Sequence, residues 1–169
     1  VPTSTPNATP NPTPTPTEVV SYTTIPDSNF EQRLIDLGYD TAPIDGQVPT
    51  DNISGLTTLT VNNENVSDLT GIEDFTALEY LNCRSNQLTS LDVSTNTALI
   101  DLSCHSNQLT SLDVSNNTAL TDLNCRSNQL TSLDVRNGNN TNFTFFNATN
   151  NPNLTCIFVD DTAYSTANW

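Results

Sequence analysis

No lysine and no methionine occur in this chain, and its four arginines stand against 19 acidic residues. The formal net charge is therefore -15. A field of that sign repels the phosphates of DNA, RNA and anionic membrane surfaces. We expect no nucleic-acid partner, and we expect a soluble, self-repelling chain.

Long hydrophobic runs are missing as well. No stretch approaches the roughly 20 apolar residues that a membrane span needs, and no charged segment followed by an apolar one reads as a signal peptide. The first residue is valine rather than methionine. We therefore expect a mature or trimmed product, located outside the cell, without insertion into a membrane.

Catalytic motifs are also scarce. The single histidine, His105, has no serine or cysteine nucleophile arranged beside it, and the sequence contains no phosphate-binding loop, HExxH or paired-acid motif. We expect no enzymatic activity, no cofactor and no metal site.

Hydrophobic residues make up 34% of the chain, which is low for a globule of this size but suits a repeat protein, because each repeat buries only a narrow stripe. Three nearly identical units begin at Leu78, Leu99 and Leu120, and the first reads LEYLNCRSNQLTSLDV. An imperfect unit precedes them, and a degenerate one follows an insertion around Gly138. We place the repeats at residues 56–158, with atypical units at both ends.

The flanking segments have different compositions. Residues 1–17 hold six of the ten prolines and six threonines, a composition typical of an extended polyproline-II tail or a disordered linker. Residues 18–55 are expected to form an N-terminal cap. In it, apolar side chains from Phe30 to Leu37 have helical spacing, with Asp27 or Ser28 as N-cap and Gly38 as the stop. Residues 159–169 would form a C-terminal cap.

The pattern LxxLxCxxNxL resembles the leucine-rich-repeat consensus with cysteine in place of one leucine. More narrowly, LTSLDVSxNTAL resembles the 21-residue repeats of secreted surface proteins of Bacteroidetes, and IPDSNFEQRLIDLGYD resembles their N-terminal cap. This resemblance implies an α/β-type solenoid, mostly strand and loop. It further implies a parallel sheet on the concave face, a short N-terminal cap helix and an extracellular location.

Equivalent residues of a parallel solenoid stack about 4.8 Å apart, so each repeat position becomes a row. Cysteine occupies an apolar position of the consensus, and we expect buried free thiols there rather than zinc ligands, because a straight column cannot converge tetrahedrally. Cys156 lies outside this column, either buried alone or separated from its partner. The inward rows are Leu78/Leu99/Leu120, Leu81/Leu102/Leu123, Cys83/Cys104/Cys125, Leu88/Leu109/Leu130, Leu91/Leu112/Leu133 and Val93/Val114/Val135.

Two polar rows call for a structural explanation. Asn86, Asn107 and Asn128 are predicted to bond neighbouring backbone groups where the chain turns out of each strand. Stacked carboxylates repel one another, so the row Asp92/Asp113/Asp134 must cap turns, face water or hold cations such as calcium.

The exposed strand positions offer a candidate binding surface. Alternation around the inward leucines places basic side chains in one column, while the remainder of the chain is almost purely acidic. Arginine and aromatic side chains on a rigid sheet suit a glycan or an extracellular protein that carries carboxylate or sulfate groups. A merely solvated sheet face is the alternative. The candidate residues are Tyr80, Arg84, Asp101, His105, Asp122 and Arg126.

Several threonines are candidates for O-glycosylation. The Bacteroidetes resemblance implies a signal Asp-Thr-Ala, which occurs at Thr41 and Thr162. The tail adds Thr3, Thr5, Thr9, Thr13, Thr15 and Thr17.

Two functions follow as alternatives. The first is a secreted or cell-surface binding and adhesion module that recognises its ligand through the concave face. The second is a glycosylated structural subunit of an extracellular filament or layer that self-associates through residues 1–17. Six of the eleven aromatic residues lie in the last 27 positions, where they either close the solenoid or receive a neighbouring copy.

Overall fold

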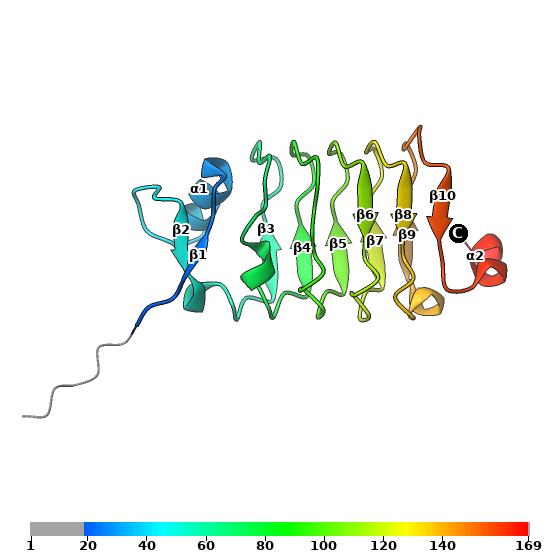
Figure 1. Cartoon of the computed structure of the whole chain (residues 1–169), viewed down its shortest axis with the longest axis horizontal. Helices are drawn as coiled ribbons and strands as arrows, with labels where there is room; N and C mark the ends of the chain where they lie inside the picture. The colour runs from blue at the N-terminus through cyan, green and yellow to red at the C-terminus, as the bar shows by residue number, and fades with distance from the viewer. Residues whose placement is uncertain (1–18, 169) are drawn as a thin grey trace, which may run out of the picture.

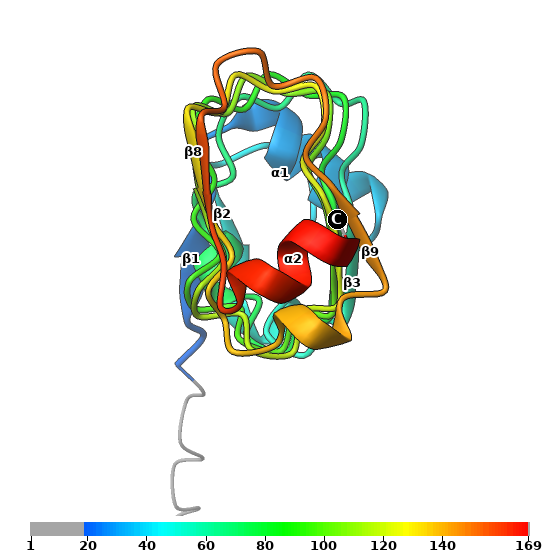
Figure 2. The same ribbon diagram turned by 90° about the vertical axis from the view of Figure 1, so that its right-hand side faces the viewer.

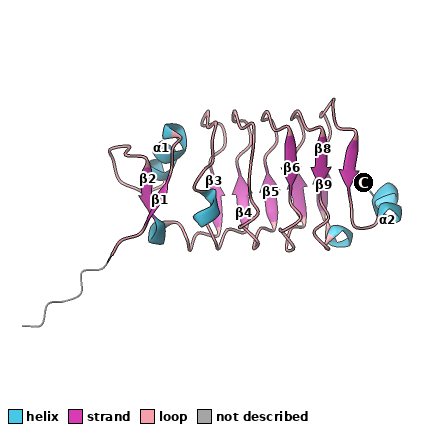
Figure 3. Cartoon of the chain, in the orientation of Figure 1, coloured by secondary structure: helices cyan, strands magenta, loops and turns pink. Residues whose placement is uncertain are grey.

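The computed structural model describes residues 19–168 of the chain, so the expectations for residues 1–17 and for Trp169 lie outside the described residues. The described part is a stack of short strands and turns that forms one elongated solenoid (Figure 1). Helix is confined to the two ends and to short turns, as the colouring by secondary structure shows (Figure 3).

The larger sheet has five parallel strands in the order β3-β4-β5-β7-β9. Their central residues Leu59, Leu81, Leu102, Leu123 and Phe146 are in register, and the four leucines are buried. This parallel stacking confirms the predicted solenoid. The strands are β3 (Thr58–Thr60), β4 (Tyr80–Asn82), β5 (Asp101–Ser103), β7 (Asp122–Asn124) and β9 (Phe145–Asn147).

A second parallel sheet, which the sequence analysis did not predict, lies on the opposite side of the coil (Figure 2). It consists of β6 (Ser111–Asp113), β8 (Ser132–Asp134) and β10 (Cys156–Phe158). This second sheet forms because Ser-Leu-Asp-Val also alternates outward and inward with a period of two. That period places Leu112 and Leu133 inside and the serines and aspartates outside.

The core lies between the two sheets. Cys83, Cys104 and Cys125 are each fully buried, and their thiols are free. Burial raises the pKa of Cys83 and Cys125 to about 12 and that of Cys104 well above its ordinary value. These thiols therefore pack as small apolar side chains and stay protonated.

An asparagine row satisfies the buried backbone where the chain leaves the larger sheet. The amide of Asn107 donates to the carbonyl oxygens of Cys83 and Cys104, both at 3.0 Å, and accepts from the backbone N–H of Leu88 at 3.1 Å. Asn86 and Asn128 make the equivalent bonds, and Asn151 continues the row into the last coil. Each amide thus joins its own coil to the preceding one.

A second asparagine row, which the sequence analysis missed, runs through the turn that follows the smaller sheet. Asn96 donates to the carbonyl oxygens of Ile72 and Phe75, and Asn117 donates to those of Val93 and Asn96. Asn137 continues the row by donating to the carbonyl oxygen of Asn117. The signal was present as the asparagine of SxNTAL, three residues before the leucine that opens each unit.

The N-terminal end is covered by a two-stranded antiparallel sheet, β1 (Tyr22–Thr24) with β2 (Gln47–Pro49), and by helix α1 (Ser28–Asp36). Asp27, one of the two predicted N-cap residues, accepts from Asn29 and Phe30 with one carboxylate oxygen. The other oxygen accepts from the backbone N–H groups of Ser67 and Asp68. Burial raises the pKa of Asp27, but these hydrogen bonds outweigh it and leave the pKa below its ordinary value.

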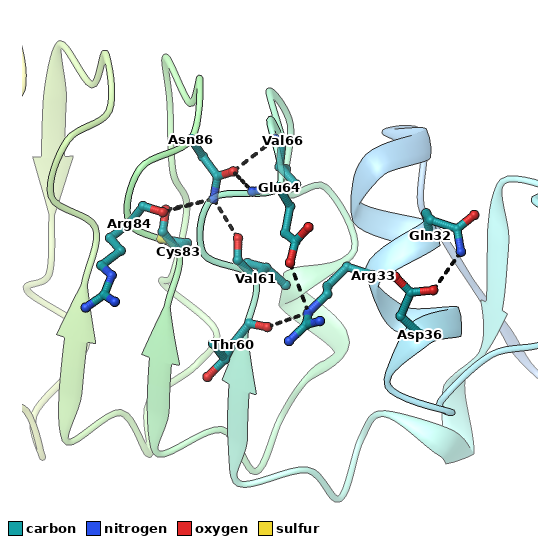
Figure 4. A network of polar contacts seen from close by, with 10 residues as sticks. All are labelled: Gln32, Arg33, Asp36, Thr60, Val61, Glu64, Val66, Cys83, Arg84 and Asn86. Atoms are coloured by element: carbon teal, nitrogen blue, oxygen red, sulfur yellow. Dashed lines mark hydrogen bonds and ion pairs between the residues drawn. The ribbon is translucent and has the colours of Figure 1, made fainter.

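Helix α1 is joined to the first coils by polar contacts (Figure 4). The Nε of Arg33 donates to the carbonyl oxygen of Thr60 at 3.0 Å and lies 3.5 Å from a carboxylate oxygen of Glu64. Short 3-10 turns follow at Thr50–Asn52 and Ile72–Asp74. Gly71 begins the second turn with φ of +103°, and a Cβ there would lie 2.4 Å from Ile25, so this position requires glycine.

The C-terminal end is built differently. After a 3-10 turn at Asn140–Asn142 and strands β9 and β10, helix α2 (Thr162–Asn168) lies across the end of the coil (Figure 2). Phe143 and Phe146 pack edge to face at 6.0 Å and are partly buried against the core, whereas Phe145 and Phe158 are exposed. Cys156 is exposed on β10, so the option of a buried fourth thiol was wrong.

Removal of one side-chain amide from the asparagine row beside the larger sheet should destabilise the whole solenoid. For Asn107→Ala, which deprives three buried backbone groups of their partner, we expect the free energy of unfolding to fall by about 3 kcal/mol. Urea unfolding followed by circular dichroism measures this loss. The control is Gln108→Ala, whose side chain is exposed and should change stability by less than about 0.5 kcal/mol. Equal effects of the two substitutions would contradict the role given to the amide row.

Candidate binding surface on the larger sheet

The outer face of the larger sheet is built from three parallel rows of side chains. The first row lies at the start of the strands and the second at their end. The third follows directly after the strands, where backbone hydrogen bonds from Ser85 to His105 and from Ser106 to Arg126 keep the coils in register. The rows are Thr58/Tyr80/Asp101/Asp122/Phe145, then Thr60/Asn82/Ser103/Asn124/Asn147, then Arg84/His105/Arg126.

All six residues predicted for ligand binding lie on this face. The structure adds Phe145, which continues the first row next to Asp122. The sequence analysis missed it because the insertion before β9 breaks the repeat spacing. From the sequence alone, Phe145 and Phe146 of this last coil could not be assigned to the inner or the outer face.

The four arginines divide into two pairs. Arg33 is bonded to Thr60 and Glu64, and Arg136 forms an ion pair with Asp134 and lies 5.0 Å from the ring centroid of Phe158. The guanidinium groups of Arg84 and Arg126 are exposed and form neither an ion pair nor a hydrogen bond with any described residue. Figure 4 shows the Arg84 side chain just after β4, with no dashed line from its guanidinium group to the other residues drawn. Two arginines on one face that pair with no described carboxylate are unusual in so acidic a chain.

His105 lies between these two arginines and is partly buried. Its Nδ1 is 3.0 Å from the hydroxyl of Ser106. Burial and the positive charges of Arg126 and Arg84 hold the pKa of His105 below its ordinary value. The imidazole is therefore neutral at physiological pH and serves as a polar, uncharged contact between two cations.

The first row has the opposite charge. Asp101 and Asp122 are directly in register, and Asp122 accepts hydrogen bonds from the hydroxyls of Thr121 and Thr144, both at 2.8 Å. Burial and the charge of Asp122 raise the pKa of Asp101. The exposed rings of Tyr80 and Phe145 lie at the two ends of this acidic pair. The face is therefore acidic and aromatic along one side and basic along the other.

The smaller sheet has a different surface. Asp92, Asp113 and Asp134 each accept a hydrogen bond from the backbone N–H two residues later, which makes them turn caps. Shallow grooves between the coils are lined by Ser90, Leu91 and Asp92. Among residues 19–168, no group of three or more His, Cys, Asp or Glu side chains is placed to hold a metal ion.

The glycosylation candidates of the described part are accessible. Thr41 lies in the exposed loop after α1, and Thr162 begins α2, where its side chain is also exposed. The six candidates of the tail lie outside the described residues. Modification of any of them stays a prediction.

Comparison with known proteins relates this geometry to solved structures of the same fold. No family model matches the chain. Internalin J of Listeria monocytogenes serotype 4b (strain F2365) is 40% identical over 72 residues. The solved functional domain of internalin J from Listeria monocytogenes, which includes a cysteine ladder, is 35% identical, with a TM-score of 0.69 over 82% of this chain. The chain has the leucine-rich-repeat fold.

A second solved leucine-rich-repeat structure supports the fold alone. It is the internalin InlF of Listeria monocytogenes str. 4b F2365, which is 24% identical, with a TM-score of 0.56. That comparison covers 80% of this chain and 44% of InlF. This chain spans only 8% of internalin J and 33% of its solved functional domain. The narrower resemblance to Bacteroidetes surface proteins stays a prediction.

In the part of the chain that the structure describes, no helix has the length and apolar character needed to cross a membrane.

Thiol reactivity provides a test of how the leucine-rich repeats bury their cysteines. In the native protein at pH 8, we expect iodoacetamide to modify Cys156 alone, because burial keeps the other three thiols protonated and inaccessible. In denaturant all four cysteines should react. Mass spectrometry of the labelled protein gives the count, and Cys156→Ser should show no native labelling. Rapid native modification of Cys104 would contradict the packed column.

The row Arg84/His105/Arg126 is called the basic row. Titration of His105, the single histidine, tests its electrostatics. We expect Arg84→Gln and Arg126→Gln each to raise the pKa of His105 toward its ordinary value, because each substitution removes a positive charge that disfavours the imidazolium. Proton NMR of the imidazole ring follows the titration. Arg136→Gln removes an arginine from the opposite sheet and should leave this pKa unchanged. A pKa insensitive to Arg84 and Arg126 would show that the row is not assembled.

Proposed function

We propose that this chain is a binding module of a secreted or cell-surface protein, and that the outer face of its larger sheet recognises an anionic group on an extracellular protein or glycan. The observation that carries the proposal is the pair of exposed guanidinium groups of Arg84 and Arg126, which pair with no carboxylate between residues 19 and 168. In a chain of net charge -15, most cations would be expected to pair with a carboxylate. Two that stay free of every described carboxylate are available to a ligand.

The geometry of the row suits a ligand with spaced negative charges. Arg84 and Arg126 are two coils apart, which corresponds to roughly 9.6 Å along the solenoid. Each planar guanidinium can donate two parallel hydrogen bonds to a carboxylate or sulfate. His105 lies between them and adds a neutral polar contact.

The acidic row sets the orientation of the ligand. Carboxylates of Asp101 and Asp122 repel an anion and accept hydrogen bonds from hydroxyl or amine groups. Tyr80 and Phe145 offer flat apolar surfaces at the ends of the same row. A ligand with acidic groups along one edge and hydroxyl or amine groups along the other would match both rows, and an acidic glycan or the edge of a protein surface has that character.

Similarity to internalin J supports a location outside the cell, and the thiol chemistry is compatible with it. Three of the four cysteines are buried with raised pKa values, so they resist oxidation and exchange. We propose no enzymatic activity, since among the described residues His105 has the hydroxyl of Ser106 as its one side-chain hydrogen-bond partner and lies between two cations.

Binding arrays provide the test. On a panel of sulfated and uronic-acid glycans together with acidic peptides, we expect Arg84→Gln or Arg126→Gln to weaken binding roughly 10- to 100-fold, the loss of one charge-assisted contact. Binding should also weaken with salt. Arg136→Gln is the matched control, because it removes an exposed arginine from the opposite sheet. Equal binding by all variants, or equal losses in all, would exclude the basic row as the recognition site.

A further inference from the structure

In its three central coils, the outer face of the larger sheet repeats at every second coil. The chain reads Asn-Cys-Arg at residues 82–84, where β4 ends, and the same three residues recur at 124–126, where β7 ends. β5 lies between these strands (Figure 1), and its end reads Ser-Cys-His at residues 103–105. The three cysteines are buried, so the difference between neighbouring coils is confined to outward side chains.

The two Asn/Arg pairs, Asn82 with Arg84 and Asn124 with Arg126, have the same local geometry. The side-chain oxygen of each asparagine accepts from the backbone N–H of its arginine at 3.4 Å. The amide nitrogens of both asparagines make no hydrogen bond with any residue between 19 and 168. Each Asn/Arg pair therefore presents an amide and a guanidinium, which are both donors and suit the oxygens of an anion.

The Ser/His pair between them, Ser103 with His105, is neutral. Burial and the two neighbouring arginines hold the pKa of His105 below its ordinary value, so the imidazole is uncharged at physiological pH. Along the solenoid axis the face is thus cationic, neutral and cationic again, in steps of about 4.8 Å. One pyranose ring of an extended sugar chain has a length close to one such step. A chain of acidic, neutral and acidic rings would match this sequence of charges.

The acidic row, Asp101 and Asp122, restricts how much charge the ligand can carry. These two carboxylates lie in register on the same face, and the whole chain has a net charge of -15. A densely sulfated ligand would bring more anions than the two arginines can compensate, and the excess would be repelled. In an extended sugar chain whose successive rings are turned over, alternate rings present the same edge. One carboxylate on every second ring would then face the basic row, while hydroxyl groups face the aspartates.

The composition of the face favours a carbohydrate over a protein. The exposed rings of Tyr80 and Phe145 are three coils apart, and Asp101 and Asp122 occupy the positions between them. Protein interfaces are built around a contiguous apolar centre, whereas sugars bind through separate flat rings and many hydrogen-bonding side chains. The middle row of this face consists of small polar residues, Thr60, Asn82, Ser103, Asn124 and Asn147.

The shape of the face favours a ligand that lies along it. Tyr80, Asn82, Asp101 and Ser103 line a hollow of about 90 Å³ between β3, β4 and β5. Pockets that enclose a small molecule have volumes of roughly 300 Å³ or more. The ligand therefore gains its contacts by extending over several coils, as a linear polymer does.

Building on the ligand function proposed above, we propose that the ligand is a linear polysaccharide in which uronic-acid and neutral rings alternate. The chain runs along the solenoid axis over β4, β5 and β7. Carboxylates of two uronic acids contact the two Asn/Arg pairs, and the neutral ring between them lies over the Ser/His pair. The acidic row accepts hydrogen bonds from hydroxyl groups on the other edge of the chain.

Isothermal titration calorimetry of the full chain tests the choice of ligand. The probes are oligosaccharides of hyaluronan and of unsulfated chondroitin, in which glucuronic acid alternates with a neutral amino sugar. We expect at least one of them to bind at least about 10-fold more tightly than oligogalacturonate, heparin fragments or acidic peptides of matched length, and reduction of its carboxylates to weaken binding by a similar factor.

The spacing of the cations has its own test. The double variant His105→Arg/Arg126→Gln keeps two arginines and the net charge of the wild type, but places them on adjacent coils. We expect it to bind the alternating oligosaccharide about 10-fold more weakly than the wild type, as Arg126→Gln does alone. Arg136→Gln, on the opposite sheet, is the control and should bind as the wild type does. Circular dichroism and urea unfolding verify that each variant is folded.

The outcomes separate this proposal from the ligand function on which it rests. Tighter or equal binding of heparin, oligogalacturonate or acidic peptide would overturn the alternating polysaccharide, and dependence of that binding on Arg84 and Arg126 would leave the proposed function standing. Undiminished binding by the double variant, or no binding of either alternating oligosaccharide by the wild type, would also overturn it. Full binding of every probe by both Arg84→Gln and Arg126→Gln would instead refute the proposed function.

Discussion

The hydrogen bonding of buried backbone at the turns is the constraint on which the rest of this structure depends. The strands of each coil are only three residues long. The turns between them therefore carry N–H and C=O groups that neither sheet can satisfy. The amides of Asn86, Asn107, Asn128 and Asn151 satisfy them on one side of the core, and those of Asn96, Asn117 and Asn137 do so on the other. Because most of these amides reach the preceding coil, they also fix the register.

Register in turn decides what the surface can do. Once each coil repeats the last, an outward residue in one unit lies beside its equivalent in the next, and charge is arranged in rows. Asp101 next to Asp122, and Arg84 next to His105 and Arg126, are consequences of this repetition. Like charges in adjacent coils are costly unless something offsets them. The aspartates of the smaller sheet gain turn hydrogen bonds, and Asp122 gains two threonine hydroxyls. Arg84 and Arg126 gain no equivalent partner within the described residues, and this makes them candidates for recognition.

The two ends of the solenoid solve the problem of the open edge differently. At the N-terminal end, Asp27 and Arg33 bind α1 to the first coils, and buried Glu31 accepts from the backbone N–H groups of Asp45 and Gly46. At the C-terminal end, α2 and the ring of Phe146 cover part of the core, while β10 and Ile157 remain accessible. The two ends of the described coils are therefore covered by different contacts, polar at α1 and largely apolar at α2.

Much of this could be predicted from the sequence by itself. The 21-residue repeat determined the solenoid, the inward leucines and the column of Cys83, Cys104 and Cys125, because periodicity specifies which side chains share a row. Alternation about those leucines also placed Arg84, His105 and Arg126 together. Only the tertiary structure decided that Ser-Leu-Asp forms a second sheet, that Phe145 extends the acidic row past an insertion, and which arginines are paired. These features depend on contacts between coils, and a period in one dimension carries no information about which long side chains meet across them.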